Sequence, residues 1–138
     1  MAMRVEISTG TLARIVAMAA ASPATEVCGL LLGTATRVVA IEPCRNVADD
    51  PARWFEIDPV ALLAAHRRAR GGGAALVGCY HSHPNGIAAP SPRDAAAAAP
   101  DGGIWLIVGG GTVTAWRAVA DGPLHGRFVE LAIAPVAG

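Results

Sequence analysis

The chain has 138 residues and a formal net charge of zero. It suits one domain over residues 1–138 and gives no electrostatic case for binding nucleic acid or an anionic membrane. No apolar segment is long enough to span a bilayer, and the N-terminus lacks a signal-peptide layout, so we expect a cytoplasmic protein. The three cysteines, an odd number without framework spacing, fit that reducing compartment.

The first half of the chain predicts two helices and three strands. Ser8 or Thr9 can cap a helix whose apolar residues recur at helical spacing until Ser22 and Pro23 end it. Asp58 followed by Pro59 is a second helix start, and this helix is predicted to continue to Arg70. Runs of apolar and β-branched residues predict strands over residues 26–33, 37–43 and 54–57.

The second half predicts more strands and one short helix. The predicted strands cover residues 74–81, 105–108, 112–118 and 127–133, with Gly-rich turns between them. Ser91 and Pro92 precede an alanine run, which indicates a helix capped by Ser91. The elements together indicate an α/β fold, with a sheet of about six strands and two or three helices.

A cluster of candidate metal ligands follows the strand at residues 74–81. His81 and His83 are two residues apart, so in an extended chain both rings point to the same face. Pro84 ends the strand pairing, and Asp94 falls in the first turn of the helix that Ser91 caps. The loop 85–90 is long enough to fold that turn back over the histidines. Two imidazoles and one carboxylate form a zinc-ligand set with one position open, as in catalytic zinc sites.

Hydrolysis at such a site also needs a general base. A zinc ion would lower the pKa of its bound water to about 7, and a nearby carboxylate outside the ligand set would have to move the protons. Glu26 opens an apolar strand, where a buried charge is costly unless it is paired. Spacing alone does not choose among the candidates Glu6, Glu26, Glu42, Glu56 and Glu130.

Three motifs together resemble the JAMM (JAB/MPN+) metalloprotease family, in its compact prokaryotic form. They are the segments 26–33 (EVCGLLLG), 81–84 (HSHP) and 90–94 (PSPRD), and the similarity extends over nearly the whole chain. The resemblance implies a single MPN/JAB-like domain of cytidine-deaminase-like layout, with a mixed, mostly antiparallel sheet. It implies one zinc ion held by His81, His83 and Asp94, and a bound catalytic water activated by Glu26.

The same resemblance assigns the role of one serine and a substrate class. Ser91 is expected to stabilise the oxyanion of the tetrahedral intermediate. Ser82 lies between the two histidines in an extended chain and points to the opposite face, so we interpret it as structural. The implied partner is a ubiquitin-like or sulfur-carrier protein with a C-terminal Gly-Gly tail, cut after that tail at a peptide or isopeptide bond. The carrier, the leaving group and the choice between monomer and homodimer stay open.

Three other functions fit the sequence less well. A non-catalytic MPN-type scaffold would lack ligands that are present here, and a zinc deaminase would need His-x-Glu and Pro-Cys-x-x-Cys strings that are absent. A RadC-like protein shares the His-x-His-Pro pattern, but it usually has a further helical segment at its N-terminus. The basic cluster at Arg67, Arg68 and Arg70 is interpreted as the solvated end of a helix, so the sequence predicts no nucleic-acid partner.

Overall fold

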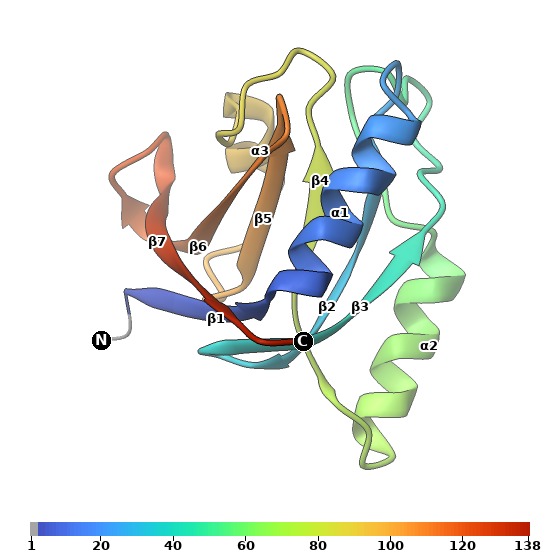
Figure 1. Cartoon of the computed structure of the whole chain (residues 1–138), viewed down its shortest axis with the longest axis vertical. Coiled ribbons are helices and arrows are strands. Elements are labelled where there is room, and N and C mark those ends of the chain that lie inside the picture. Colours follow the sequence, from blue (N-terminus) through green and yellow to red (C-terminus); the bar gives the residue numbers. More distant parts are fainter. Residues whose placement is uncertain (1–2) are drawn as a thin grey trace.

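One closed sheet of seven strands forms the body of the molecule (Figure 1). The computed structural model describes residues 3–138. The strands are β1 (Arg4–Ser8), β2 (Cys28–Thr34), β3 (Arg37–Cys44), β4 (Ala75–Ser82), β5 (Ile104–Gly109), β6 (Thr112–Gly122) and β7 (Gly126–Val136). The helices are α1 (Thr9–Ala21), α2 (Pro59–Arg70) and α3 (Pro92–Ala97). No helix in this part of the chain is long and apolar enough to cross a membrane.

The sheet closes because β1 pairs with two strands. The order is β1-β3-β2-β4-β5-β6-β7, and β1 lies parallel to both β3 and β7. The pairing of β4 with β5 is parallel too, and the other four pairings are antiparallel. The prediction of a mixed, mostly antiparallel sheet is confirmed, but the sheet has seven strands where about six were expected, and it is closed.

Two segments differ from the strands expected from the sequence. The first strand, β1, was not predicted, although Val5 and Ile7 alternate with polar neighbours and are fully buried. The predicted strand over residues 54–57 is not a strand: only Ile57 forms an isolated bridge, with Asn46. The Asn46 side chain accepts a hydrogen bond from the Glu56 N–H, so a side chain replaces the ladder partner there.

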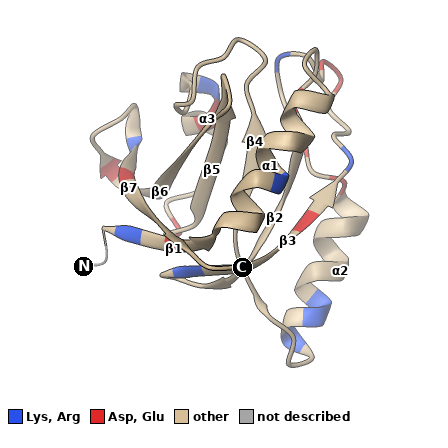
Figure 2. Cartoon of the chain, viewed as in Figure 1, with Lys and Arg blue, Asp and Glu red and all other residues tan. Residues whose placement is uncertain are grey.

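The helix starts agree with the capping residues in the sequence. The Ser8 hydroxyl accepts from the Thr11 N–H, and the Asp58 carboxylate accepts from the Val60 N–H. α2 ends in three exposed arginines, which confirms the solvated helix end and gives the blue segments at the end of this helix in Figure 2. One of them, Arg68, pairs with Glu42 of β3.

The core fills the sheet interior and the space beneath α1. Ile15 of α1 is fully buried and packs with Leu31, Tyr80 and Leu106. A smaller cluster around Phe128 and Trp116 includes Ala95 of α3 and Ala98, the residue that follows this helix. Burial of such side chains stabilises a fold by about 1.5–3 kcal/mol each, so both clusters fix the strands that carry polar groups at their ends.

The pairing of β2, β4 and β5 brings the predicted site to one end of the closed sheet. β4 runs antiparallel to β2 and parallel to β5, so the start of β2 lies beside the ends of the other two strands. Cys28 of β2, His81 of β4, Ile107 of β5 and Thr114 of β6 are aligned across the strands. Residues aligned in this way point to the same face.

Candidate metal centre

The two histidines lie at and just beyond the end of β4. His81 is the penultimate residue of the strand and is fully buried, and His83 is 9% exposed. The His83 N–H donates to the Val108 carbonyl at 2.8 Å, which continues the contact with β5 past the strand end. Ser82 points elsewhere, since its hydroxyl accepts from the Val27 N–H at 2.9 Å. Its expected structural role is to tie β4 to the segment that holds Glu26.

Asp94 completes a tight cluster with the histidines. The two Nε2 atoms lie 3.1 Å apart. Asp94 Oδ1 is 3.2 Å from His81 Nε2, and Asp94 Oδ2 is 3.2 Å from His83 Nε2. The aspartate is 1% exposed. The loop after His83 therefore folds back as expected and places the first turn of α3 over both imidazoles.

A capping box fixes the aspartate. The Ser91 hydroxyl accepts from the Asp94 N–H at 3.0 Å, and the Asp94 Oδ2 atom accepts from the Ser91 N–H at 2.9 Å. This reciprocal pair begins α3, with Pro92 in the first position. Asp94 Oδ1 has no hydrogen-bond partner among the described residues. One carboxylate oxygen is thus anchored while the other is free to bind a ligand.

Aromatic packing and a carbonyl hold the imidazole rings. Phe55 stacks on His81 with centroids 4.2 Å apart, and Trp105 meets the same ring edge-on at 5.7 Å. The second ring is held by the contact of His83 Nδ1 with the Ile87 carbonyl at 2.9 Å. Because a carbonyl only accepts, Nδ1 carries a hydrogen, and Nε2 is the ring nitrogen that faces the cluster and can bind a metal once it is deprotonated.

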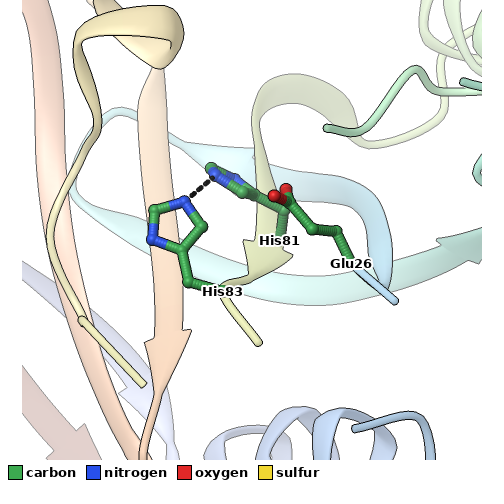
Figure 3. A group of neighbouring side chains, drawn as sticks. All are labelled: Glu26, His81 and His83. Atoms are coloured by element: carbon green, nitrogen blue, oxygen red, sulfur yellow. Dashed lines mark hydrogen bonds between the residues drawn. The ribbon is translucent and has the colours of Figure 1, made fainter. Parts of the chain in front are cut away.

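Glu26 lies beside the histidines, outside the closest contacts (Figure 3). One of its carboxylate oxygens and a ring nitrogen from each histidine all lie within 4.8 Å of one another. The side chain is 5% exposed, and its Oε1 atom has no hydrogen-bond partner in residues 3–138. The Asp94 oxygens lie 3.2 Å from the ring nitrogens, whereas the Glu26 carboxylate forms no hydrogen bond or ion pair with either ring in the described chain. The geometry therefore favours Asp94 as a ligand and leaves Glu26 next to it.

Backbone contacts place Glu26. Its N–H donates to the Pro51 carbonyl at 2.7 Å, and its carbonyl accepts from the Asn46 side-chain amide at 2.9 Å. The same amide also donates to the Trp54 carbonyl. Asn46 therefore joins Glu26 to the loop that carries Phe55. No sequence pattern indicated that Asn46 and Phe55 make these supporting contacts.

Burial shifts the pKa of several of these groups. Desolvation raises the pKa of Glu26 to about 7, partly offset by the positive charge of His83, so this carboxyl can exchange a proton near neutral pH. Burial lowers the pKa of His81 and keeps its ring neutral. Desolvation would raise the pKa of Asp94, but the close polar contacts of its carboxylate with His81 and His83 outweigh it and hold that pKa low.

The donor set fits a zinc ion. Zinc bonds to nitrogen and oxygen of about 2.0–2.1 Å give a tetrahedron with edges of about 3.3 Å. The distance of 3.1 Å between the two Nε2 atoms and that of 3.2 Å from His81 Nε2 to Asp94 Oδ1 are close to that edge. A neutral His81, a His83 Nε2 atom turned inward and an Asp94 Oδ1 atom without a hydrogen-bond partner in the described residues also suit a metal, which binds deprotonated nitrogen and carboxylate.

Cys28 is a neighbour of the site with little reactivity. It is aligned with His81 across β2 and β4. Burial raises the pKa of its thiol to about 12, so almost no thiolate exists at neutral pH. The pKa of Cys79 is raised by burial too. Neither cysteine has the character of a redox-sensitive residue.

Comparison with known families identifies the chain. The family of prokaryotic homologs of the JAB domain matches residues 8–119, which include all the residues of the cluster. The chain belongs to this family. A JAB1/MPN domain protein from Archaeoglobus fulgidus has the same fold, with a TM-score of 0.57 and 18% identity over 95% of this chain and 98% of that one. The resemblance that the three motifs indicated is therefore confirmed.

Two curated relatives of this JAB-domain chain are enzymes by name. A desampylase from Haloferax volcanii is 36% identical over 119 residues, covering 84% of this chain and 82% of that protein. A probable TtuB-protein conjugate cleaving protease from Thermus thermophilus is 44% identical over 57 residues, or 41% of this chain and 38% of that protein.

Proposed function

We propose that this JAB-domain protein is a zinc-dependent isopeptidase or peptidase. It hydrolyses the bond that follows the Gly-Gly tail of a ubiquitin-like or sulfur-carrier protein. The observation that carries the proposal is the convergence of His81, His83 and Asp94 on one buried point with Glu26 beside it. The names of the two relatives support action on a protein conjugate.

His81, His83 and Asp94 would hold the zinc ion. When bound, zinc supplies Lewis acidity, which polarises a carbonyl and lowers the pKa of water to about 7. The residues around it supply a rigid and dry setting. Phe55 and Trp105 exclude water from one side of His81, and the Ile87 carbonyl fixes the His83 tautomer.

Glu26 is proposed to move protons. It lies within reach of the ligand cluster and has no competing hydrogen bond at Oε1 within the described chain. As a base it removes a proton from the attacking water, and as an acid it delivers that proton to the departing amine. The two roles need one carboxyl that changes protonation twice in a turnover, which its buried position suits.

The Gly-Gly tail is proposed on steric grounds. The ligands lie at one end of the closed sheet, where β4 is paired on both sides, so an extended segment can reach them only by lying across the strand ends. Residues without Cβ can come close to these strand ends, whereas larger residues are kept away from the buried cluster. We therefore expect the two residues before the cleaved bond to be glycines.

Ser91 is proposed to donate to the oxyanion. Its hydroxyl accepts from Asp94, and it donates to no group in residues 3–138, so its hydrogen is available. The Ser91→Ala variant should lose about 10²-fold in kcat from the missing oxyanion donor and about 1 kcal/mol of stability from the missing cap. Turnover measured well below the melting temperature separates the two effects. A change in melting temperature with unchanged kcat would leave Ser91 as a cap only.

Cleavage of defined conjugates tests the proposal. A ubiquitin-like carrier ending in Gly-Gly, extended by a peptide or joined to a lysine of a second protein, is incubated with the enzyme and analysed by intact mass. We expect a cut directly after Gly-Gly that stops on treatment with a chelator and returns with added zinc. Carriers ending in Ala-Ala serve as the control. Absence of both cleavage and stoichiometric zinc would instead favour a scaffold.

A further inference from the structure

The loop between the proposed metal ligands is held by the C-terminal half of the chain. Residues 84–90 connect His83 to the helix cap at Ser91 and have no regular secondary structure. Three carbonyls in this loop accept hydrogen bonds or close polar contacts. The Ile87 carbonyl receives His83 Nδ1 at 2.9 Å, the Ala88 carbonyl accepts from the Thr114 hydroxyl at 2.8 Å, and the Pro90 carbonyl lies 3.1 Å from His125 Nε2.

The contact with Thr114 is the most constrained of the three. Thr114 belongs to β6 and is aligned with Ile107 of β5, which is aligned in turn with His81. Its hydroxyl accepts from the Trp116 indole N–H at 2.8 Å and donates to Ala88. Because a hydroxyl has a single hydrogen, the indole contact directs that hydrogen toward the loop.

Backbone packing keeps the loop against the same strands. A Cβ atom on Gly109, the last residue of β5, would lie 2.6 Å from the Ala88 nitrogen and from the Ile87 carbonyl carbon. The loop therefore rests directly on the backbone of Gly109. By contrast, His125 is exposed in the turn between β6 and β7, so its contact is open to water.

We propose that Thr114 is a positioning residue for the metal centre. Its hydroxyl fixes the Ala88 carbonyl, and the neighbouring Ile87 carbonyl then holds His83 Nδ1 and turns Nε2 toward Asp94. The relay runs from Trp116 through Thr114 and the loop to the His83 ring. It rests on the proposed function, in which His83 binds zinc, and it adds a residue two strands away from His81.

Zinc affinity and turnover of Thr114 variants test this relay. Thr114→Val keeps the shape of the side chain but removes the hydroxyl, and we expect about 10-fold weaker zinc binding. We also expect kcat to fall about 10-fold while KM stays within a factor of two, since the loop orients a ligand and does not hold the substrate. Zinc affinity is measured by competition with a chelating dye, and kcat and KM with the Gly-Gly-tailed conjugate.

Three further variants separate positioning from stability. Thr114→Ser keeps the hydroxyl and should match the wild type, and Thr112→Val, an exposed residue of the same strand, should do so too. Thr114→Val leaves the mostly buried indole N–H of Trp116 without its partner, which by itself destabilises the fold. The double variant Thr114→Val with Trp116→Phe removes both polar partners, so it should regain stability but not zinc affinity.

The outcomes are distinct for the relay and for the enzyme. If the double variant regains wild-type zinc affinity and kcat together with stability, or if Thr114→Val changes only the melting temperature, the relay is wrong. If Thr114→Val does not fold, the double variant alone decides in the same way. A wild-type protein that neither binds zinc nor cleaves the conjugate overturns the proposed function, and the relay with it.

Discussion

Replacing Glu26 by glutamine is expected to lower kcat by about 10²- to 10⁴-fold, which is the usual contribution of a general acid–base residue. Glutamine keeps the size and the hydrogen-bonding reach of the side chain but cannot accept and return a proton. The backbone contacts that place residue 26, to Pro51 and Asn46, do not depend on the side chain. Zinc affinity should therefore stay within a few-fold of the wild type. Turnover of the conjugate and a zinc titration on the same preparation measure both.

The matched control is Glu56→Gln, because Glu56 is exposed in the loop that Asn46 joins to Glu26. It should retain wild-type turnover. A Glu26→Gln protein with normal kcat would exclude Glu26 as the base. A Glu26→Gln protein that loses zinc would instead show that Glu26 is a ligand. Its carboxylate and the two histidine nitrogens lie within 4.8 Å of one another, which is close enough for that arrangement.

Replacing Asp94 by asparagine is expected to weaken zinc binding by more than about 100-fold, the upper end of what loss of an outer contact to a metal ligand costs. The charge is lost, while the side-chain oxygen can still accept from the Ser91 N–H and so keep the start of α3. Turnover should fall below detection at zinc concentrations that saturate the wild type. A zinc competition titration and the conjugate assay give the two values.

Asp49→Asn is the control for this change, since Asp49 is an exposed carboxylate in the loop after β3. It should bind zinc and turn over normally. Retention of both zinc and activity by Asp94→Asn would contradict the ligand set of His81, His83 and Asp94. Circular dichroism of the variant shows whether the helix cap has survived.

Local chemistry explains what the sequence could predict. Ser8, Asp58 and Ser91 each accept a hydrogen bond from a nearby backbone N–H, so the helix starts are properties of a few adjacent residues. The spacing of His81 and His83 sets their shared face in the same local way. The meeting of Asp94 with both rings was also predictable, because a short loop and a capped helix leave few other arrangements.

Long-range pairing explains what could not be predicted. β1 lies between β3 and β7, which are distant from each other in sequence, and no local pattern specifies a sheet that closes on itself. The stretch at residues 54–57 has strand-forming residues, but Asn46 and the stacking of Phe55 on His81 decide its conformation. The choice of Glu26 among five glutamates likewise needed either the family resemblance or the folded chain.

The residues that support the metal ligands could not be predicted from the sequence for the same reason. Thr114 and Trp105 lie on strands after the ligands, and their closeness to the site follows from the alignment of β4, β5 and β6. Nothing in the spacing of a threonine from a histidine 31 positions away indicates that their side chains contact neighbouring carbonyls of one loop, those of Ala88 and Ile87. Supporting residues of this kind come from the fold and not from a motif.

An anomalous difference map, recorded at the zinc absorption edge from crystals grown with zinc, tests the central claim most directly. We expect one peak, at bonding distance from His81 Nε2, His83 Nε2 and an oxygen of Asp94. One coordination position should be open, and Glu26 should lie beside the zinc ion without a bond to it. A map with no peak between these three side chains, or with a zinc ion that Glu26 binds in place of Asp94, would contradict it.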